Sequence, residues 1–389
     1  MTQSPAPGLL PSGLSDLLAP DAGFEAQLLE RLIGACESRG YERVKPPMME
    51  FEDSLLSGTG AAMDRQVFRL MDPVSQRMMG LRADITPQIA RIAETRLGGA
   101  PRPLRLCYAG QVLRVCGDQI RPERQFAQIG AELIGSENPA ADAEVIRLGH
   151  DALKAVGITG LSVDLGVPTL VASLLADQPD LARSADLRDA LDHKDTGALD
   201  GFFQGADKPA VGMLRALVAA SGPAEKTIKA VAAIDLPAPV RREWDGLLAV
   251  VDSLSRQAPD MTLTIDPVEH RGFEYHAGVT FTIYAANVRG ELGSGGRYRA
   301  GAAGQAGAGE PATGFTLFTD SLLRALPRPE TNHRLYVPFA ANARPLDGLR
   351  ADGWITVMGL EPTDQPTQEA QRLGCGHWLD GDTPAPVGA

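Results

Sequence analysis

The stretch LRLCYAGQVLRVCGDQIRPERQFAQIGAELI, residues 104–134, decides the fold of this chain. Its two ends, residues 104–114 and 125–134, alternate between apolar and polar side chains, as strands with two different faces do. The linker between them is polar and contains Gly117 and Pro122, which favour a loop. The pattern therefore predicts two antiparallel strands joined by a loop.

One face of the second predicted strand is a candidate ligand floor. Gln128, Gly130 and Glu132 share this face, because every second residue of a strand points the same way. Gly130 has no side chain and would leave a gap over the sheet. Glu132 could hold an ammonium group, and Arg114 could clamp a carboxylate or phosphate. The alternative is a solvent-exposed face covered by salt bridges, which the stretch taken alone slightly favours.

Other segments of the chain carry recognisable helix and strand patterns. Helical spacing predicts helices over residues 23–39, 86–99 and 138–157, and a helical insertion over residues 178–258. Strand patterns predict a strand at residues 261–267, a hairpin within residues 277–298 and a strand running into a helix over residues 313–326. Residues 300–312 read as a small-residue loop, and residues 333–389 as a short α/β module.

Composition limits the classes of function that fit. The chain has 389 residues, enough for two or three domains, and a net charge of −12, which disfavours a large nucleic-acid surface. No apolar run is long enough to span a bilayer. The four cysteines have neither metal-site nor disulfide-framework spacing. We expect a cytoplasmic protein without metal or cofactor.

Two further segments carry polar side chains that could meet a ligand. Arg82 and Asp84 come just before a predicted helix, and Thr86 is available to cap it, which is the ordinary role. A second acid near Glu132 would also suit an amine ligand. The segment HRGFEYHAGVTF begins at His270 and includes His276, yet no third ligand at sensible spacing supports a metal site. Its arginine and aromatic residues suit a small polar ligand better.

Together these segments resemble the core of class II aminoacyl-tRNA synthetases, and specifically the histidyl branch, over residues 9–326. GYERVKPPMMEFED resembles motif 1, LRADITPQIAR through GAELIG resembles motif 2, and PATGFTLFTDSLL resembles motif 3. RGFEYHAGVTF and GSGGRY resemble the histidine-recognition segments of that branch. The resemblance implies an α+β fold, with an antiparallel sheet flanked by helices in residues 1–326. Residues 331–389 would form a C-terminal module shorter than an anticodon-binding domain.

The resemblance also maps an amino-acid pocket onto this sequence. Asp84 stands where synthetases usually have Glu, and His276 where they have a second Tyr. The implied histidine-binding positions are Asp84, Thr86, Arg114, Gln128, Glu132, Arg271, Tyr275, His276 and Tyr298.

Two positions depart from what ATP activation requires in that branch. Cys116 stands where motif 2 has an acidic residue, and a thiol cannot coordinate a hard cation as a carboxylate does. Ser321 stands where the motif 3 helix has an arginine, and Arg324 lies almost one helical turn further on. The resemblance therefore implies no catalytic residues in this chain.

A chain with a kept pocket, altered ATP motifs and a short C-terminus resembles the regulatory subunits of ATP phosphoribosyltransferase. That resemblance implies a self-dimer through motif 1, and a hetero-octamer with the short catalytic subunit. The complex would perform the first step of histidine biosynthesis and be inhibited by histidine. No tRNA and no membrane partner are expected. The alternatives are an active histidyl-tRNA synthetase and a stand-alone amino-acid-binding paralogue.

Overall fold

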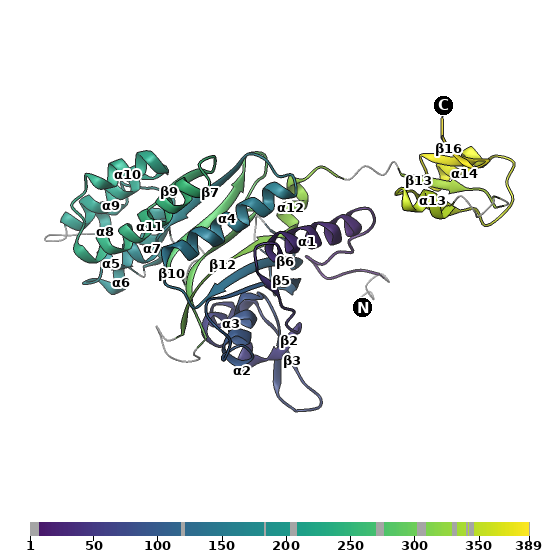
Figure 1. Ribbon diagram of the computed structural model, residues 1–389. Coiled ribbons are helices and arrows are strands. Elements are labelled where there is room, and N and C mark those ends of the chain that lie inside the picture. The colour runs from purple at the N-terminus through teal and green to yellow at the C-terminus, as the bar shows by residue number, and fades with distance from the viewer. Residues whose placement is uncertain are drawn as a thin grey trace, which may run out of the picture. The chain divides into compact units, whose positions relative to one another are not determined.

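The computed structural model describes most of the chain. Its contacts divide the chain into two compact units: Met1–Asp16 with Glu25–Leu326, and Leu17–Phe24 with Pro327–Ala389 (Figure 1). The described residues are 8–117, 121–182, 184–202, 208–269, 276–301, 309–328, 333–339, 341 and 346–388.

The first unit is built on a sheet of nine strands among the described residues, in the order β1-β5-β6-β12-β11-β10-β7-β9-β8. Neighbouring strands are antiparallel except in the pairs β1–β5 and β7–β9, so the α+β class with a mainly antiparallel sheet is confirmed. The strands are β1 (Glu42–Arg43), β5 (Leu104–Leu113), β6 (Gln125–Ile134), β7 (Leu161–Gly166), β8 (Gly222–Pro223), β9 (Thr262–Asp266), β10 (His276–Ala285), β11 (Gly293–Ala300) and β12 (Glu310–Phe318).

The predicted strand–loop–strand unit forms the centre of this sheet. β5 and β6 pair antiparallel, with Tyr108 opposite Gly130 and Leu106 opposite Glu132. On its other side β6 pairs with β12, where Gly314 lies opposite Glu132. Residues opposite each other in a ladder share a sheet face, so Tyr108, Glu132 and Gly314 point to the same side. β12 begins at Glu310, earlier than the small-residue pattern of 300–312 predicted.

Helices lie on both faces of the sheet. Their bounds are α1 (Asp21–Glu37), α2 (Glu52–Leu55), the 3₁₀ helix η1 (Gly58–Gln66), α3 (Thr86–Thr95), α4 (Pro139–Ala155), α5 (Thr169–Leu174), α6 (Pro179–Ala182), α7 (Ala185–Asp192), α8 (Leu199–Phe202), α9 (Lys208–Ala220), α10 (Ala224–Ala232), α11 (Ala238–Gln257) and α12 (Thr319–Ala325). Helices α6 to α11 occupy the stretch 178–258, together with the short strand β8, which the sequence did not predict.

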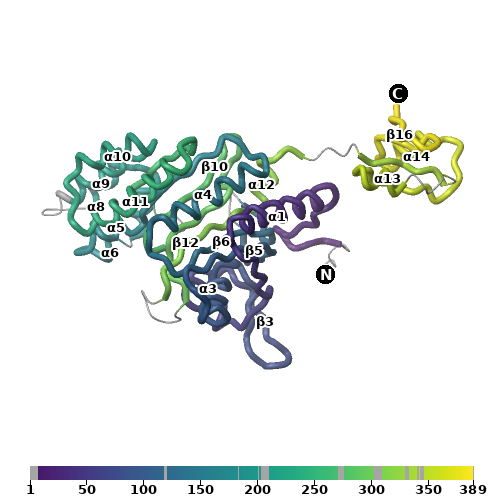
Figure 2. Tube along the Cα trace, in the orientation of Figure 1, coloured from purple at the N-terminus to yellow at the C-terminus, as the bar shows by residue number. Residues whose placement is uncertain are grey.

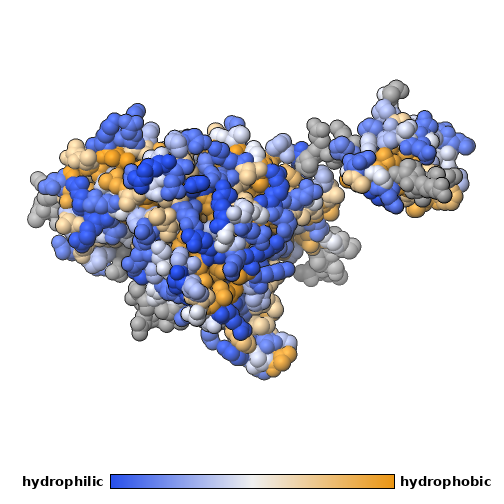
Figure 3. All heavy atoms as spheres, viewed as in Figure 1, coloured by the Kyte–Doolittle hydropathy of each residue, from blue (hydrophilic) through white to orange (hydrophobic). Residues whose placement is uncertain are grey.

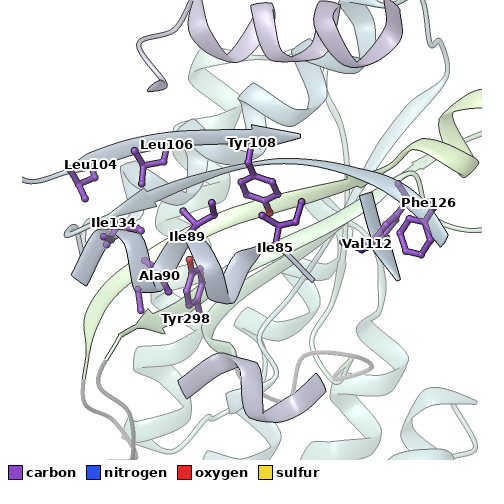
Figure 4. Packing of buried hydrophobic residues seen from close by; sticks show 14 residues of the cluster. Ile85, Ile89, Ala90, Leu104, Leu106, Tyr108, Val112, Phe126, Ile134 and Tyr298 are labelled. Carbon is purple, nitrogen blue, oxygen red and sulfur yellow. The ribbon is translucent and has the colours of Figure 1, made fainter. Parts of the chain in front are cut away.

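Helix α3 covers the face of the sheet that carries Glu132. Ile85 and Ile89 pack there against buried side chains of β5 and β6, including Leu106 and Tyr108. Figure 4 shows this cluster, with the hydroxyl ends of Tyr108 and Tyr298 pointing toward one another. The helix ends at Thr95 rather than at the predicted residue 99, because the Leu97 N–H donates to the Ile92 carbonyl in a wide turn.

Helix α4 packs on the opposite face of the sheet, where β6 presents Ala127, Ile129, Ala131 and Leu133. These four side chains are fully buried, which confirms the predicted apolar face of the strand. Helix α1 begins at Asp21, two residues earlier than predicted, and ends before Gly40. Gly40 has φ of +83°, the left-handed conformation that closes helices at a glycine.

A small sheet projects from the first unit. Its strands β2 (Met49–Phe51), β4 (Met78–Leu81) and β3 (Phe68–Met71) lie in the order β2-β4-β3, and β3 and β4 form a hairpin (Figure 2). The hairpin tip exposes Met71 and Val74, and apolar atoms are visible at this tip in Figure 3.

The second unit contains a sheet of four strands among the described residues, in the order β14-β13-β15-β16. Leu335, Val337, Leu346 and Leu379 form part of its core. The predicted series of strand, helix–strand and helix–strand is present, and the last strand, β16, was not predicted. Its elements are β13 (Arg334–Val337), α13 (Leu346–Ala351), β14 (Ile355–Met358), α14 (Pro366–Arg372), β15 (His377–Asp380) and β16 (Thr383–Pro386).

Candidate functional site

The side chain of Glu132 lies at the bottom of a pocket on the α3 side of the sheet. It is 1% exposed, and hydroxyl groups surround its carboxyl group. The Tyr298 hydroxyl donates to Oε2 at 2.9 Å, and the Thr86 and Tyr108 hydroxyls contact Oε1 at 3.1 and 3.3 Å. Among the described residues, no lysine or arginine forms an ion pair with this carboxyl group.

Burial raises the pKa of Glu132 to about 8, because a charged carboxylate loses its hydration inside the protein. Hydrogen bonds from Tyr298, Thr86 and Tyr108 oppose this rise, and the nearby charge of Asp84 adds to it. The carboxyl group is therefore mostly protonated at neutral pH in the empty pocket. A cation placed beside it would stabilise the ionised form.

The pocket holds about 200 Å³ of empty space, a figure that includes open solvent at its mouth. Its walls come from α3 and from four strands, β6, β10, β11 and β12. The lining residues are Thr86, Glu132, His276, Ser294, Gly295, Gly296, Tyr298, Gly314, Phe315 and Thr316.

Glycine makes room for the buried carboxyl group. A Cβ atom on Gly314 would overlap the Glu132 carboxylate and approach the Ala131 carbonyl. A Cβ atom on Gly296, which lies opposite Gly314 in the ladder, would come within 2.7 Å of the His276 ring. The glycines of β11 and β12 thus keep this part of the sheet free of side chains, and the space becomes part of the pocket.

Asp84 and Gln128 support the rim of the pocket. The Thr86 N–H donates to Asp84 Oδ1 at 2.8 Å, and the Ile85 N–H donates to Gln128 Oε1 at 3.1 Å. Gln128 Nε2 donates to Asp84 Oδ2 at 3.4 Å. The predicted side-chain capping is absent, because the cap residue is Ile85 and Asp84 lies one residue before it. The bonds of Asp84 and Gln128 nevertheless hold the start of α3 over Glu132.

Two expectations for the β6 face are wrong. Gln128 and Glu132 are buried, so the alternative of a solvent-exposed face fails. The gap expected over Gly130 is filled by the Tyr108 hydroxyl, which a Cβ atom at Gly130 would overlap. Tyr108 reaches this position because it lies directly opposite Gly130 on β5.

Arg114 lies beyond the end of β5 and does not line this pocket. Its guanidinium carbon is 5.0 Å from the centre of the Phe126 ring, and its Nε donates to the Ala83 carbonyl at 3.4 Å. Arg121 lies over the Phe318 ring at 3.8 Å and forms an ion pair with Glu291 at 2.8 Å. The arginines of the opening stretch therefore lie beside aromatic rings.

The two positions that depart from the synthetase pattern lie outside the pocket lining. The Cys116 side chain is exposed, and its N–H is 3.5 Å from Gln66 Oε1. Ser321 is buried on α12 and accepts a hydrogen bond from Arg324 Nη2 at 3.0 Å. Arg324 also pairs with Asp320 at 3.2 Å, so its guanidinium group binds to its own helix.

Of the predicted segment 270–281, His276 lines the pocket. His270, Arg271 and Tyr275 lie outside the described residues, so their predicted roles stay predictions. No cluster of three or more potential metal-binding side chains occurs among the residues that the structure describes. The four cysteines are free thiols.

A second cluster of carboxyl groups lies toward the other end of the same sheet. Lys194, which follows α7, pairs with Asp266 at the end of β9, and the Ser221 hydroxyl donates to Asp266 Oδ1 at 3.0 Å. Burial raises the pKa of Glu269 to about 7, and the neighbouring Asp164 charge adds to this rise. No local pattern indicated this cluster, because its members come from four distant segments.

Sequence reasoning also missed Tyr108, Gly314 and Thr316. The stretch TGFTLF alternates, so Gly314, Thr316 and Phe318 share one face of their strand. That alternation was the available signal for a polar face on β12. The role of Tyr108 had no such signal, because it depends on the register between β5 and β6.

Comparison with known proteins places the chain in a family. A family model described as histidyl-tRNA synthetase matches residues 13–322. The ATP phosphoribosyltransferase regulatory subunit of Paramagnetospirillum magneticum is 52% identical, over 98% of each chain. That of Rhodospirillum centenum is also 52% identical, over 97% of this chain and 96% of its own. The chain belongs to the family of ATP phosphoribosyltransferase regulatory subunits. Its relatives thus carry the name of a regulatory rather than a catalytic subunit.

Solved structures show how this regulatory-subunit family is folded. A Bacillus halodurans protein titled ATP phosphoribosyltransferase regulatory subunit/histidyl-tRNA synthetase has a TM-score of 0.77 at 23% identity, covering 95% of this chain and 97% of its own. A histidyl-tRNA synthetase from a Nostoc species has a TM-score of 0.68 at 17% identity, covering 96% and 91%. At these identities the likeness shows a shared synthetase-like fold. In the described residues, no helix is long and apolar enough to cross a membrane.

Proposed function

We propose that this chain is a non-catalytic regulatory subunit that binds histidine in the Glu132 pocket and inhibits the ATP phosphoribosyltransferase with which it assembles. The observation that carries the proposal is a buried carboxyl group whose partners are hydroxyls, at the bottom of a pocket, in a chain from this family. Such a group is suited to a cationic or N–H-bearing ligand.

The lining of the pocket supports a small polar ligand. It presents the Glu132 carboxyl group, the Thr86 and Tyr298 hydroxyls and the His276 ring. Histidine carries an ammonium group and an imidazole N–H that can donate to Glu132. Asp84, Thr86, Gln128 and Tyr298 would supply further polar contacts, and Arg271, Tyr275 and His276 are the remaining proposed members. Arg114, which the sequence also predicted, lies outside the pocket lining.

Regulation by this pocket would operate through linkage. A bound ligand shifts an equilibrium between two states of a complex only by the difference in its affinity for them. Histidine would therefore lower activity if the pocket is better formed in the less active state of the assembly. The start of α3, held by Asp84 and Gln128 over Glu132, is the element that a ligand would contact first.

The proposal assigns no reaction to this chain. Cys116 cannot replace the acidic ligand expected in motif 2, and Ser321 supplies no positive charge on α12. Arg324 does not restore that charge at the expected position, because its guanidinium group is bonded to Asp320 and Ser321. We therefore propose that ATP activation has been lost.

The proposed assembly follows the family. A self-dimer through the motif 1 region would join the short-form catalytic subunit in a cytoplasmic hetero-octamer, without tRNA. Residues 1–326 would form the synthetase-like core, with the insertion at about 178–258. Residues 331–389 would form a module truncated relative to an anticodon-binding domain.

Reconstitution tests the proposed function. The purified chain is mixed with a short-form catalytic subunit, and the condensation of ATP with phosphoribosyl pyrophosphate is followed with and without histidine. We expect activity that requires both chains and that histidine suppresses. Activity of the catalytic subunit that is unchanged by this chain would contradict the assembly, and would favour a stand-alone amino-acid-binding paralogue.

A separate assay tests the loss of ATP chemistry. Histidine-dependent exchange of pyrophosphate into ATP measures amino-acid activation directly. We expect no exchange above background from the chain alone, with an active histidyl-tRNA synthetase as the positive control. Robust exchange would show that the chain is an active synthetase and would overturn the non-catalytic assignment.

A further inference from the structure

Tyr108 joins the pocket carboxyl group to a second hydroxyl that lies behind it. Its side chain is fully buried, and its hydroxyl oxygen lies 3.3 Å from Glu132 Oε1, 3.1 Å from Thr86 Oγ1 and 3.1 Å from Thr316 Oγ1. Tyr108 is absent from the pocket lining, whereas Thr86, Glu132 and Thr316 belong to it. Any effect of Tyr108 on a ligand therefore acts through these three residues.

The single proton of the Tyr108 hydroxyl can point in only one direction at a time. A hydroxyl donates one hydrogen bond and accepts others, so either oxygen of the Tyr108–Thr316 pair can be the donor. A protonated Glu132 has a proton of its own to donate, and an ionised Glu132 can only accept. A neutral Glu132 can therefore donate its proton to Tyr108, whereas an ionised Glu132 can only accept from it.

The surroundings of Glu132 favour its proton in the empty pocket. Burial raises its pKa, and the charge of Asp84, from the segment before α3, raises it further. The other titratable groups facing it among the described residues are Tyr108 on β5, His276 on β10 and Tyr298 on β11. Burial raises the pKa of Tyr108 well above its ordinary value, so that hydroxyl remains protonated and serves as a donor.

From this geometry we infer that binding of a cationic ligand at Glu132 expels the carboxyl proton to the solvent, and that Tyr108 is the positioning residue that accommodates both states. In the empty pocket, Glu132 donates to Tyr108, and Tyr108 donates to Thr316. In the occupied pocket, the ligand cation donates to ionised Glu132, and the Tyr108 hydroxyl turns to donate to it as well. This inference rests on the proposed histidine site.

Calorimetry on the full-length chain tests the inference. L-histidine is titrated at pH 7 in two buffers with different enthalpies of ionisation, and the difference in observed heat gives the number of protons released. A carboxyl group with a pKa of about 8 holds about nine-tenths of a proton at pH 7, so we expect release of roughly 0.5–0.9 proton per site. Release should fall toward zero at pH 9.

Tyr108→Phe distinguishes a positioning role from a structural one. In this variant ionised Glu132 loses a hydrogen-bond donor, so the pKa of Glu132 should rise. The midpoint of a plot of histidine affinity against pH should therefore move upward by about 0.5–1 pH unit. Its affinity should fall several-fold at pH 7, and less at pH 9. Tyr336→Phe in the second unit is the matched control, because that buried hydroxyl has no hydrogen-bond partner among the described residues. Changes in the protonation of the histidine ligand are the same for all variants, so they cancel when the variants are compared.

Each outcome has a distinct meaning. Histidine binding with heats that do not depend on buffer would overturn the inference and leave the proposed function intact. A loss of affinity in Tyr108→Phe that is equal at every pH would show that Tyr108 is only structural. If the variant does not fold, proton release by the wild-type chain alone still decides the first claim. Absence of histidine binding to the wild-type chain would overturn both proposals.

Discussion

Two carboxylates, Glu132 and Asp266, lie in a single row of residues across the main sheet and have different partners. The row runs through Gly314, Gly296, Thr280 and Gly166, each opposite the next in the ladder. Five strand spacings separate the two residues by about 24 Å. Asp266 forms an ion pair with the ammonium group of Lys194, whereas the described partners of Glu132 are hydroxyl groups.

The difference separates a carboxylate with a structural partner from the one that we propose binds a ligand. Lys194 follows a helix of the insertion and supplies a permanent charge, so Asp266 stabilises the position of that helix. Glu132 is buried more completely, and none of the described lysines and arginines pairs with it, an arrangement that a stable core would normally avoid. Burying this carboxyl group costs free energy, and such a cost is typical of a site that binds a ligand, here a cationic one.

The largest expected effect comes from Glu132→Gln. Loss of the charge should weaken histidine binding by about 2–5 kcal/mol, from roughly 30-fold to several thousand-fold, because a buried cation loses its counter-charge. Asp266→Asn, in the same row, is the matched control and should change the affinity less than about twofold. Calorimetry measures both. Equal losses in the two variants would remove the distinction between the carboxylates.

The stability of the empty protein should reveal the same group through pH. The pKa of Glu132 is raised from 4.5 to about 8 on folding, so its contribution to stability is fully present below pH 4.5 and is lost as pH rises through 8. Relative to Glu132→Gln, the wild-type chain should lose roughly 3–4 kcal/mol of unfolding free energy between pH 5 and 8.5. Urea unfolding at several pH values measures this difference. Parallel pH profiles would show that Glu132 ionises freely.

Gly314→Ala should damage the pocket from the neighbouring strand. Its Cβ atom would overlap the Glu132 carboxylate, so either the carboxylate or β12 must shift, at a cost of about 1–3 kcal/mol. We expect a lower melting temperature and weaker histidine binding. Gly246→Ala is the control, because that position on α11 has open space for a Cβ atom and alanine favours helix. A Gly314→Ala chain with wild-type affinity would place the ligand elsewhere.

The smallest effect should come from Lys194→Met. The Lys194 side chain is about one-third exposed, at 35%, so its ion pair with Asp266 should contribute about 1 kcal/mol or less to stability. Histidine affinity should stay within about twofold of the wild-type value. Thermal unfolding and calorimetry measure the two quantities. A loss of histidine binding would show that the two carboxylates are coupled, contrary to their proposed independence.

Local sequence patterns predicted most of the helices and strands. The features that they missed depend on pairing between elements that are distant in the sequence. Alternation in residues 104–134 predicted the central strands, and the register that places Tyr108 over Gly130 appeared only in the folded ladder. Thr86, Glu132, His276 and Tyr298 were expected in the site and line one pocket, whereas Arg114 does not. The Lys194–Asp266 pair could not be predicted, because no local period links residues 72 positions apart.

Feedback inhibition of the reconstituted complex tests the central claim most directly. Complexes of the short-form catalytic subunit with either the wild-type or the Glu132→Gln chain are assayed for condensation of ATP with phosphoribosyl pyrophosphate over a range of histidine concentrations. The account predicts that both complexes are active, and that only the wild-type complex is inhibited at concentrations that fill its pocket. Identical inhibition curves for the two complexes would contradict it and would place the effector site away from Glu132.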